Sequence, residues 1–85
     1  DYRSAIYYFQ LAAQAGLPRA LNNLGVMYHN GTGVSKDLTI AYGYYLWAVV
    51  MGEKDNASNN IKILEKNGAI MIPKIELTII APRMA

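Results

Sequence analysis

The side chains best suited to recognition chemistry in this sequence are two pairs of asparagines. Asn22 and Asn23 recur 37 residues later as Asn59 and Asn60. A side-chain amide both donates and accepts hydrogen bonds, so it can bind a peptide backbone or a terminal carboxylate. An equally simple interpretation of Asn23 and Asn60 is structural: their amides hydrogen-bond a neighbouring helix or loop and hold the fold together.

Helical spacing places these asparagines on two ridges, because residues three and four apart share one helix face. The ridges consist of Arg19, Asn22, Val26 and His29, and of Asn56, Asn59, Ile63 and Lys66. We expect both ridges to be exposed, with Asn22 and Asn59 pointing further outward than Asn23 and Asn60. Together they would form a mildly basic, amide-rich surface, and they are the candidate binding residues.

The sequence offers no catalytic or metal-binding constellation. His29 is the only histidine and there is no cysteine, whereas a catalytic histidine needs a nucleophile and an orienting group, and a zinc site needs several such ligands. Gly31 and Gly33 do not form a phosphate loop, because they follow a helical pattern instead of a strand and no Lys-Ser/Thr pair ends the motif. We therefore predict a protein that is not an enzyme and that uses no cofactor or metal.

Five helices are predicted to position these residues, near 2–15, 18–30, 38–51, 56–67 and 73–81, with no sheet. Pro18 suits a first helical turn, and Asp37 can cap the free N–H groups of the helix that follows it. Gly31 and Gly33 interrupt the pattern, and we expect left-handed turns there. The last segment also alternates as a strand would, but a lone strand has no partner in an all-helical pattern, so a helix is favoured.

Small and aromatic residues share the apolar faces of these helices. The small residues, which would let helices approach closely, are Ala12, Ala20, Gly25, Ala41 and Ala48. The aromatic residues, which we expect to fill the space around them, are Tyr8, Phe9, Tyr28, Tyr44 and Tyr45. Tyr42, Leu46 and Trp47 lie outside the main apolar face of the helix expected at 38–51. We expect these three to face the next helix pair, and a partner site is the alternative.

Composition narrows the class of protein further. The chain has 85 residues, 53% of them hydrophobic, which suits one small folded domain. A formal net charge of +2, with basic residues spread singly along the chain, does not indicate a nucleic-acid partner. Residues 38–51 carry no charge, but about 20 apolar residues are needed to span a bilayer, so no membrane insertion is expected.

The chain also repeats itself. Ala5, Tyr8, Ala12 and Gly16 recur 36 residues later as Ala41, Tyr44, Ala48 and Gly52. After one inserted residue the match continues, with Ala20 falling on Ala57, and it decays where Gly25 meets Lys62. We therefore expect residues 1–68 to hold the second helix of one repeat, one complete repeat at 18–52 and the first helix of a degenerate repeat. Residues 69–85 would form a C-terminal capping segment.

Three motifs carry a resemblance to a known family. Ala-x-x-Tyr-Phe-x-x-Ala-Ala-x-x-Gly at 5–16 and Ala-x-x-Tyr-Tyr-x-x-Ala-x-x-x-Gly at 41–52 resemble the second helix of a Sel-one-like repeat. Ala-x-x-x-Leu-Gly-x-x-Tyr-x-x-Gly-x-Gly-Val-x-x-Asp at 20–37 is similar to the first helix and loop of that repeat. The resemblance implies an all-α fold, a right-handed superhelix (solenoid) of antiparallel helix pairs like those of tetratricopeptide proteins. It also implies an adaptor function, in which the chain binds other proteins and holds them together.

In related solenoids the first helix of each pair lines a concave groove, so the resemblance makes the two ridges the binding face for a protein or peptide. An RNA-binding helical repeat is the alternative, which the low charge disfavours. A small hydrolase is a weaker alternative, because no nucleophile–base pair is present.

The helix expected at 2–15 carries apolar residues on both flanks of its main stripe: Tyr2, Ile6, Tyr7 and Leu11. A repeat buries its faces only against its neighbours, and a large exposed apolar patch usually marks an interface. We therefore expect either further repeats upstream or self-association through this helix.

Overall fold

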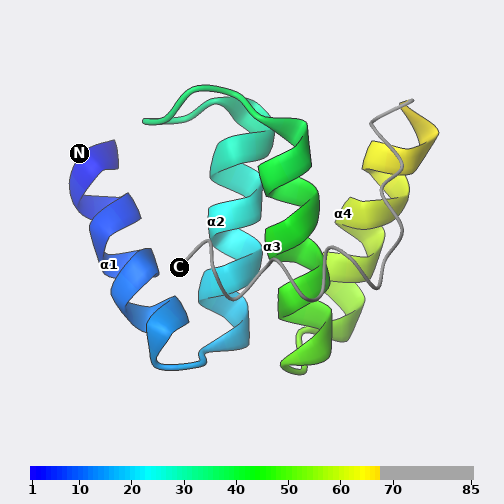
Figure 1. The fold of residues 1–85 in the computed structure, drawn as a ribbon, viewed down its shortest axis with the longest axis horizontal. Coiled ribbons are helices and arrows are strands. Elements are labelled where there is room, and N and C mark those ends of the chain that lie inside the picture. Colours follow the sequence, from blue (N-terminus) through cyan, green and yellow to red (C-terminus); the bar gives the residue numbers. More distant parts are fainter. Residues whose placement is uncertain (68–85) are drawn as a thin grey trace.

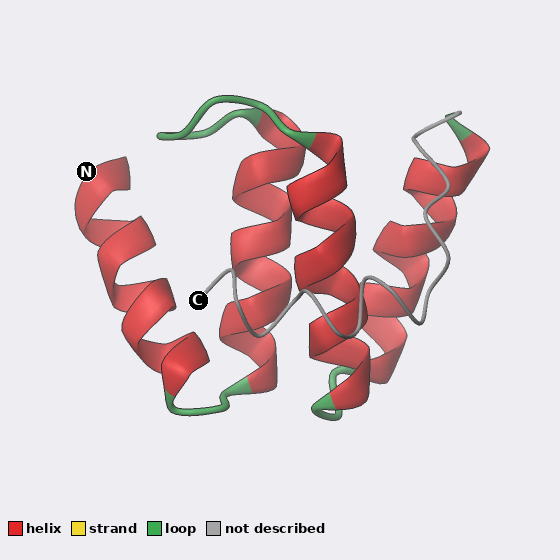
Figure 2. Ribbon diagram, in the orientation of Figure 1, coloured by secondary structure: helices red, strands yellow, loops and turns green. Residues whose placement is uncertain are grey.

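The computed structural model describes residues 1–67, which Figure 1 draws as a ribbon. This part of the chain contains four α-helices: α1 (Tyr2–Gln14), α2 (Pro18–Asn30), α3 (Leu38–Val50) and α4 (Lys54–Lys66). Among these residues there is no strand, as the colouring of Figure 2 shows. The first four predicted helices are confirmed. The helix predicted near 73–81 and the capping segment predicted at 69–85 lie outside the described residues.

The helices stand side by side in chain order, each antiparallel to the one before it (Figure 1). α1 packs on α2, α2 on α3, and α3 on α4. The arrangement is that of an all-α helical-repeat solenoid, so the predicted fold class is confirmed.

Local signals set the starts of the first three helices. Asp37 caps α3, because its carboxylate accepts a hydrogen bond from the Ile40 N–H at 2.9 Å. Asp1 lies 36 residues earlier and caps α1 in the same way, accepting from the Arg3 N–H at 3.0 Å. Pro18 is the first residue of α2, where its missing N–H costs nothing.

The start of α4 was predicted two residues too late. The helix begins at Lys54 instead of Asn56. Asn56 is inside the first turn, where its side chain donates a hydrogen bond to the Glu53 carboxylate at 2.8 Å. Asp55 lies in the same turn, and its negative charge is favourable near the positive end of the helix dipole. These first residues carry no apolar periodicity, which is why the hydrophobic pattern did not include them.

The loop between α2 and α3 contains the two predicted left-handed glycines. Gly31 has a φ of 70° and Gly33 a φ of 75°. The Asp37 N–H donates to the Tyr28 carbonyl at 3.0 Å and closes the loop. A Cβ on Gly33 would lie 2.6 Å from the Cβ of Tyr2, so the loop also touches the start of α1. The prediction of left-handed turns is confirmed.

The core centres on α3, in which residues 41–46 are all buried. Tyr45 lies directly against α2 at Gly25, where an added Cβ would come to 2.5 Å from the ring Cδ1. Tyr44 stacks on Tyr28 of α2, with ring centroids 5.7 Å apart. The predicted combination of small and aromatic residues is confirmed between these two helices.

The other side of α3 packs on α4. Burial raises the pKa of the Tyr42 hydroxyl, and the Glu65 carboxylate of α4, which is hydrogen-bonded to it, raises that pKa further. Leu46 is buried as well, and Trp47 is half-buried against the core. The expectation that these residues face the next helix pair is confirmed for Tyr42, and Leu46 is buried in the core.

The aromatic prediction is wrong at one position. Tyr8 was expected in the core, but 67% of it is exposed. Its counterpart Tyr44, 36 residues later, is only 1% exposed. The two tyrosines differ in burial because their helices have different neighbours. α2 covers this face of α3, whereas among residues 1–67 no helix covers the same face of α1.

Candidate functional site

One pair of asparagine amides links α2 directly to α4. The Asn60 Nδ2 donates a hydrogen bond to the Asn22 Oδ1 at 3.0 Å. Asn22 is only 8% exposed, so its predicted place on an exposed ridge is wrong. Helical spacing gives the direction of the Asn22 side chain but not its partner, which is Asn60 of α4. For Asn60 the structural interpretation is therefore confirmed.

His29 also has a structural partner. Its Nδ1 lies 3.0 Å from the Tyr45 hydroxyl, a hydrogen bond that joins the end of α2 to α3. The two rings meet edge to face with centroids 6.1 Å apart. Burial raises the pKa of Tyr45, which keeps its hydroxyl protonated at neutral pH. His29 is half-buried in this contact, so it is not the fully exposed ridge residue that was predicted.

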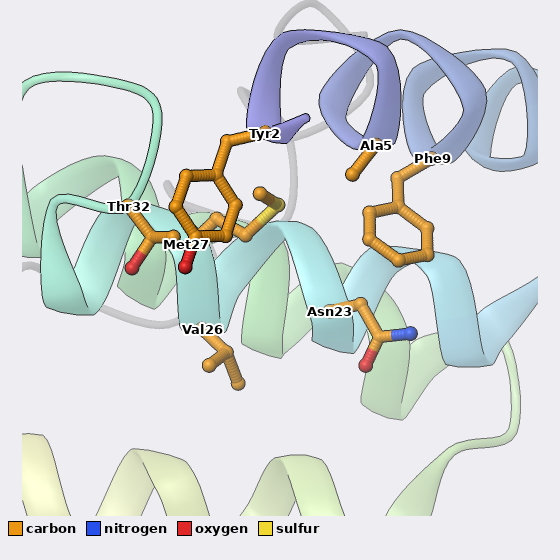
Figure 3. A pocket seen from close by; sticks show the side chains of 7 residues that line it. All are labelled: Tyr2, Ala5, Phe9, Asn23, Val26, Met27 and Thr32. Carbon is orange, nitrogen blue, oxygen red and sulfur yellow. The ribbon is translucent and has the colours of Figure 1, made fainter.

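A pocket of about 360 Å³ opens between α1 and α2. Its lining residues are Tyr2, Ala5, Phe9, Asn23, Val26, Met27 and Thr32. Figure 3 shows Tyr2 and Phe9 reaching from α1 toward α2, on either side of Ala5. Asn23 and Val26 border the pocket from α2. None of the lining side chains is charged, so the pocket suits an uncharged apolar ligand surface with a hydrogen-bonding group near Asn23.

The predicted ridge residues thus fall into three groups. Arg19, Asn56, Asn59, Ile63 and Lys66 are exposed; Asn23, Val26, His29 and Asn60 are half-buried; and Asn22 is buried. Only Asn23 and Val26 line the pocket. Whether any of these residues binds a partner stays a prediction.

Sequence reasoning missed most of the pocket. None of Tyr2, Ala5, Phe9, Met27 and Thr32 was predicted as a site residue. A signal was present in the internal repeat: Phe9 aligns with Tyr45 and Asn23 with Asn60. The repeat therefore pairs two pocket residues with two residues that contact α2.

The described residues offer little ionic or metal chemistry. Within residues 1–67 no group of three His, Asp or Glu side chains could hold a metal ion. Across the same residues every buried side-chain nitrogen and oxygen has a hydrogen-bond partner. None of the helices there is long and apolar enough to cross a membrane.

Antiparallel helix pairs in a row, with α2 and α4 linked side by side, define a helical-repeat module. The family model of the Sel1 repeat matches residues 1–17 and 18–48, more than half of the chain. The chain therefore belongs to the Sel1 repeat family, and the resemblance of its motifs is confirmed. Sel1 repeats generally mediate protein–protein interactions, and the family is typically a non-enzymatic scaffold. No curated protein and no solved structure matches the chain.

Proposed function

We propose that this chain is a non-catalytic scaffold or adaptor module that binds a peptide or protein. The binding face is formed by α2 and α4, which we take as the first helices of two successive repeats. The observation that carries the proposal is the hydrogen bond from Asn60 to Asn22. This bond joins α2 to α4, and on that ground we treat the exposed side chains of the two helices as one surface.

The chemistry of this face suits a protein partner. Ile63 is 47% exposed on α4, and the α1–α2 pocket adds further apolar area. Asn59 and the cations Arg19 and Lys66 are exposed on the same two helices, α2 and α4. An apolar centre with a polar rim is the usual composition of a protein–protein interface.

The proposal includes the domain organisation expected from the internal repeat. α1 is the second helix of one repeat, residues 18–52 form a complete repeat with α2 and α3, and α4 is the first helix of a degenerate repeat. In this division α2 and α4 are equivalent helices of successive repeats, and the Asn60–Asn22 bond joins them.

A double variant tests the binding face. A partner captured with the wild-type chain is measured against Asn59→Ala with Ile63→Ala, two exposed positions on α4. We expect binding to weaken by roughly tenfold or more, as when a central apolar contact is lost, with an unchanged denaturation midpoint. Val50→Ala is the matched control, because Val50 is an exposed apolar residue at the end of α3.

Wild-type affinity in the double variant would refute the binding face. An RNA ligand whose affinity falls steeply with salt would instead favour the RNA-binding alternative. Asn22 is not a suitable test position, because its removal would leave the Asn60 amide without its partner and would lower stability as well as binding.

A further inference from the structure

Two faces of α3 are covered by its neighbours. Tyr45 lies against α2 at Gly25, and Tyr42 is hydrogen-bonded to Glu65 of α4. Helical spacing places the outer face of α3, which points to neither neighbour, along Thr39, Ile40, Gly43, Trp47 and Val50. A helix ahead of α1 would not reach this outer face, because α1 and α2 stand between them (Figure 1).

The outer face of α3 is apolar where the equivalent face of α1 is polar. On α1 the positions 36 residues earlier include Arg3, Ser4 and Gln14, all of them exposed. On α3 these positions are Thr39, Ile40 and Val50, and no residue of Leu38–Val50 is charged. A helix that is apolar all round is normally buried all round. Val50 is nevertheless 62% exposed, so the outer face still has apolar surface to bury.

Gly43 lies in the middle of the outer face. Its counterpart on α1 is Tyr7, which is 59% exposed, whereas Gly43 is buried. Ile40 and Trp47, one turn to either side of Gly43, are half-buried. A glycine between two larger apolar side chains lets another segment approach the helix closely. The outer face is thus shaped to be covered.

The chain supplies a segment of matching chemistry. Residues 69–85 lie outside the described residues, and their sequence is rich in large apolar side chains: Ile70, Met71, Ile72, Ile75, Leu77, Ile79 and Ile80. The segment follows α4, which ends beside the start of α3 because the two helices are antiparallel (Figure 1). α3 has 13 residues and is about 20 Å long at 1.5 Å per residue. Residues 69–85 can therefore span its full length in a helical or an extended conformation.

We propose that residues 69–85 pack along the outer face of α3, with their isoleucine side chains on Ile40 and Trp47 and in the notch at Gly43. This assigns a face to the capping segment expected from the sequence: it covers α3, not the outer side of α4. A segment of the same chain is favoured over a second copy, because its covalent link gives it a high effective concentration and a second copy would lose translational freedom. The proposal goes beyond the proposed function, because it concerns α3 and not the binding face of α2 and α4.

The test uses Trp47, the only tryptophan of the chain, as the reporter. In the full isotope-labelled chain we expect NOEs between the Trp47 indole and isoleucine methyl groups of residues 70–80. The double variant Ile75→Asp with Ile79→Asp should abolish these NOEs and raise the acrylamide quenching constant of Trp47 by roughly twofold, because a carboxylate is not buried on an apolar face without a partner. Lys74→Asp is the matched control in the same segment, and it should leave both measurements unchanged, since this position is already charged.

The absence of NOEs from residues 70–80 to Trp47 would overturn the proposal, and so would equal quenching in the double variant and the wild type. NOEs from this segment to α4 alone would make it a cap of α4 instead. NOEs between a labelled and an unlabelled chain would assign the outer face to a second copy. Far-UV circular dichroism checks that the double variant keeps its helices, and if it does not, the NOEs of the wild-type chain decide. The Asn59 and Ile63 experiment tests the proposed function separately, because both positions lie on α4.

Discussion

α1 and α3 occupy the same place in successive repeats, yet they differ sharply in burial. Tyr44 is 1% exposed and its counterpart Tyr8 is 67% exposed. Tyr45 is fully buried, whereas Phe9 is half-buried at the edge of a pocket. The two helices carry the same apolar pattern, so the difference comes from their surroundings and not from their own residues.

The surroundings differ in the number of helices that cover each one. α3 is packed between α2 and α4, whereas among residues 1–67 α1 packs only on α2. In a helical repeat each unit buries its faces against its neighbours. A repeat motif therefore specifies which residues can be buried, and the adjoining helix decides whether they are.

The largest expected difference between the two helices is at Tyr45 and Phe9. Tyr45→Ala should destabilise the fold by about 3–5 kcal/mol, because it opens a cavity in the core and removes the partner of His29. Phe9→Ala should cost about 1 kcal/mol, because its ring is only half-buried. Chemical denaturation of both variants measures the two values. Equal losses would show that the two positions are energetically alike and would contradict the comparison.

A smaller loss is expected where α2 approaches α3. Gly25→Ala should destabilise by about 3 kcal/mol, since the new methyl group would overlap the Tyr45 ring. In a Tyr45→Val background the same change should cost much less, because the overlapping ring is gone. A double-mutant cycle measured by denaturation tests this coupling, and strictly additive losses would speak against the contact.

In the loop after α2, substitution of Gly31 should lower stability more than substitution of Ser35. Gly31→Val should destabilise by about 2 kcal/mol, because a β-branched residue is strained at a φ of 70°. Ser35→Val is the control, since this exposed loop residue has no positive φ. Denaturation midpoints that are equal for the two variants would refute the role of Gly31.

The smallest expected effect appears only at high pH. Burial, with a contribution from nearby Tyr28, raises the pKa of Tyr44 from 10.0 to about 12. The hydroxyl is thus more easily deprotonated in the unfolded chain, so its stabilising contribution is complete below pH 10 and is lost as the pH rises toward 12. Denaturation midpoints measured across this range should fall, and less so in Tyr44→Phe. A Tyr44→Phe variant with the same alkaline loss as wild type would contradict this assignment.

The helices were predictable because their apolar spacing, caps and glycines are local signals. Pro18, Asp37 and Gly31 each act within a few residues of their own position, and the structure confirms all three. The same local reasoning failed for Asn22 and Tyr8. Helical spacing gives the direction of a side chain, but α4 covers Asn22 and no described helix covers Tyr8.

The pocket could not be predicted from the sequence for a related reason. Phe9 of α1 lines this pocket, whereas its counterpart Tyr45 of α3 lies against α2 at Gly25. Periodicity describes one helix at a time and does not show which side chains a neighbouring helix covers. The alignment of Asn23 with Asn60 became informative only when the Asn60–Asn22 bond was known.

The claim that an adjoining helix decides burial is tested most directly by adding such a helix to α1. Fusing a second copy of residues 18–36 ahead of Asp1 would place it as α2 stands before Asp37. Hydrogen exchange should then show new protection of α1 around Tyr8 and Phe9, together with a higher denaturation midpoint. A copy carrying Gly25→Leu should give neither. An added segment that leaves the exchange of α1 and the midpoint unchanged would contradict the claim that an adjoining helix decides burial.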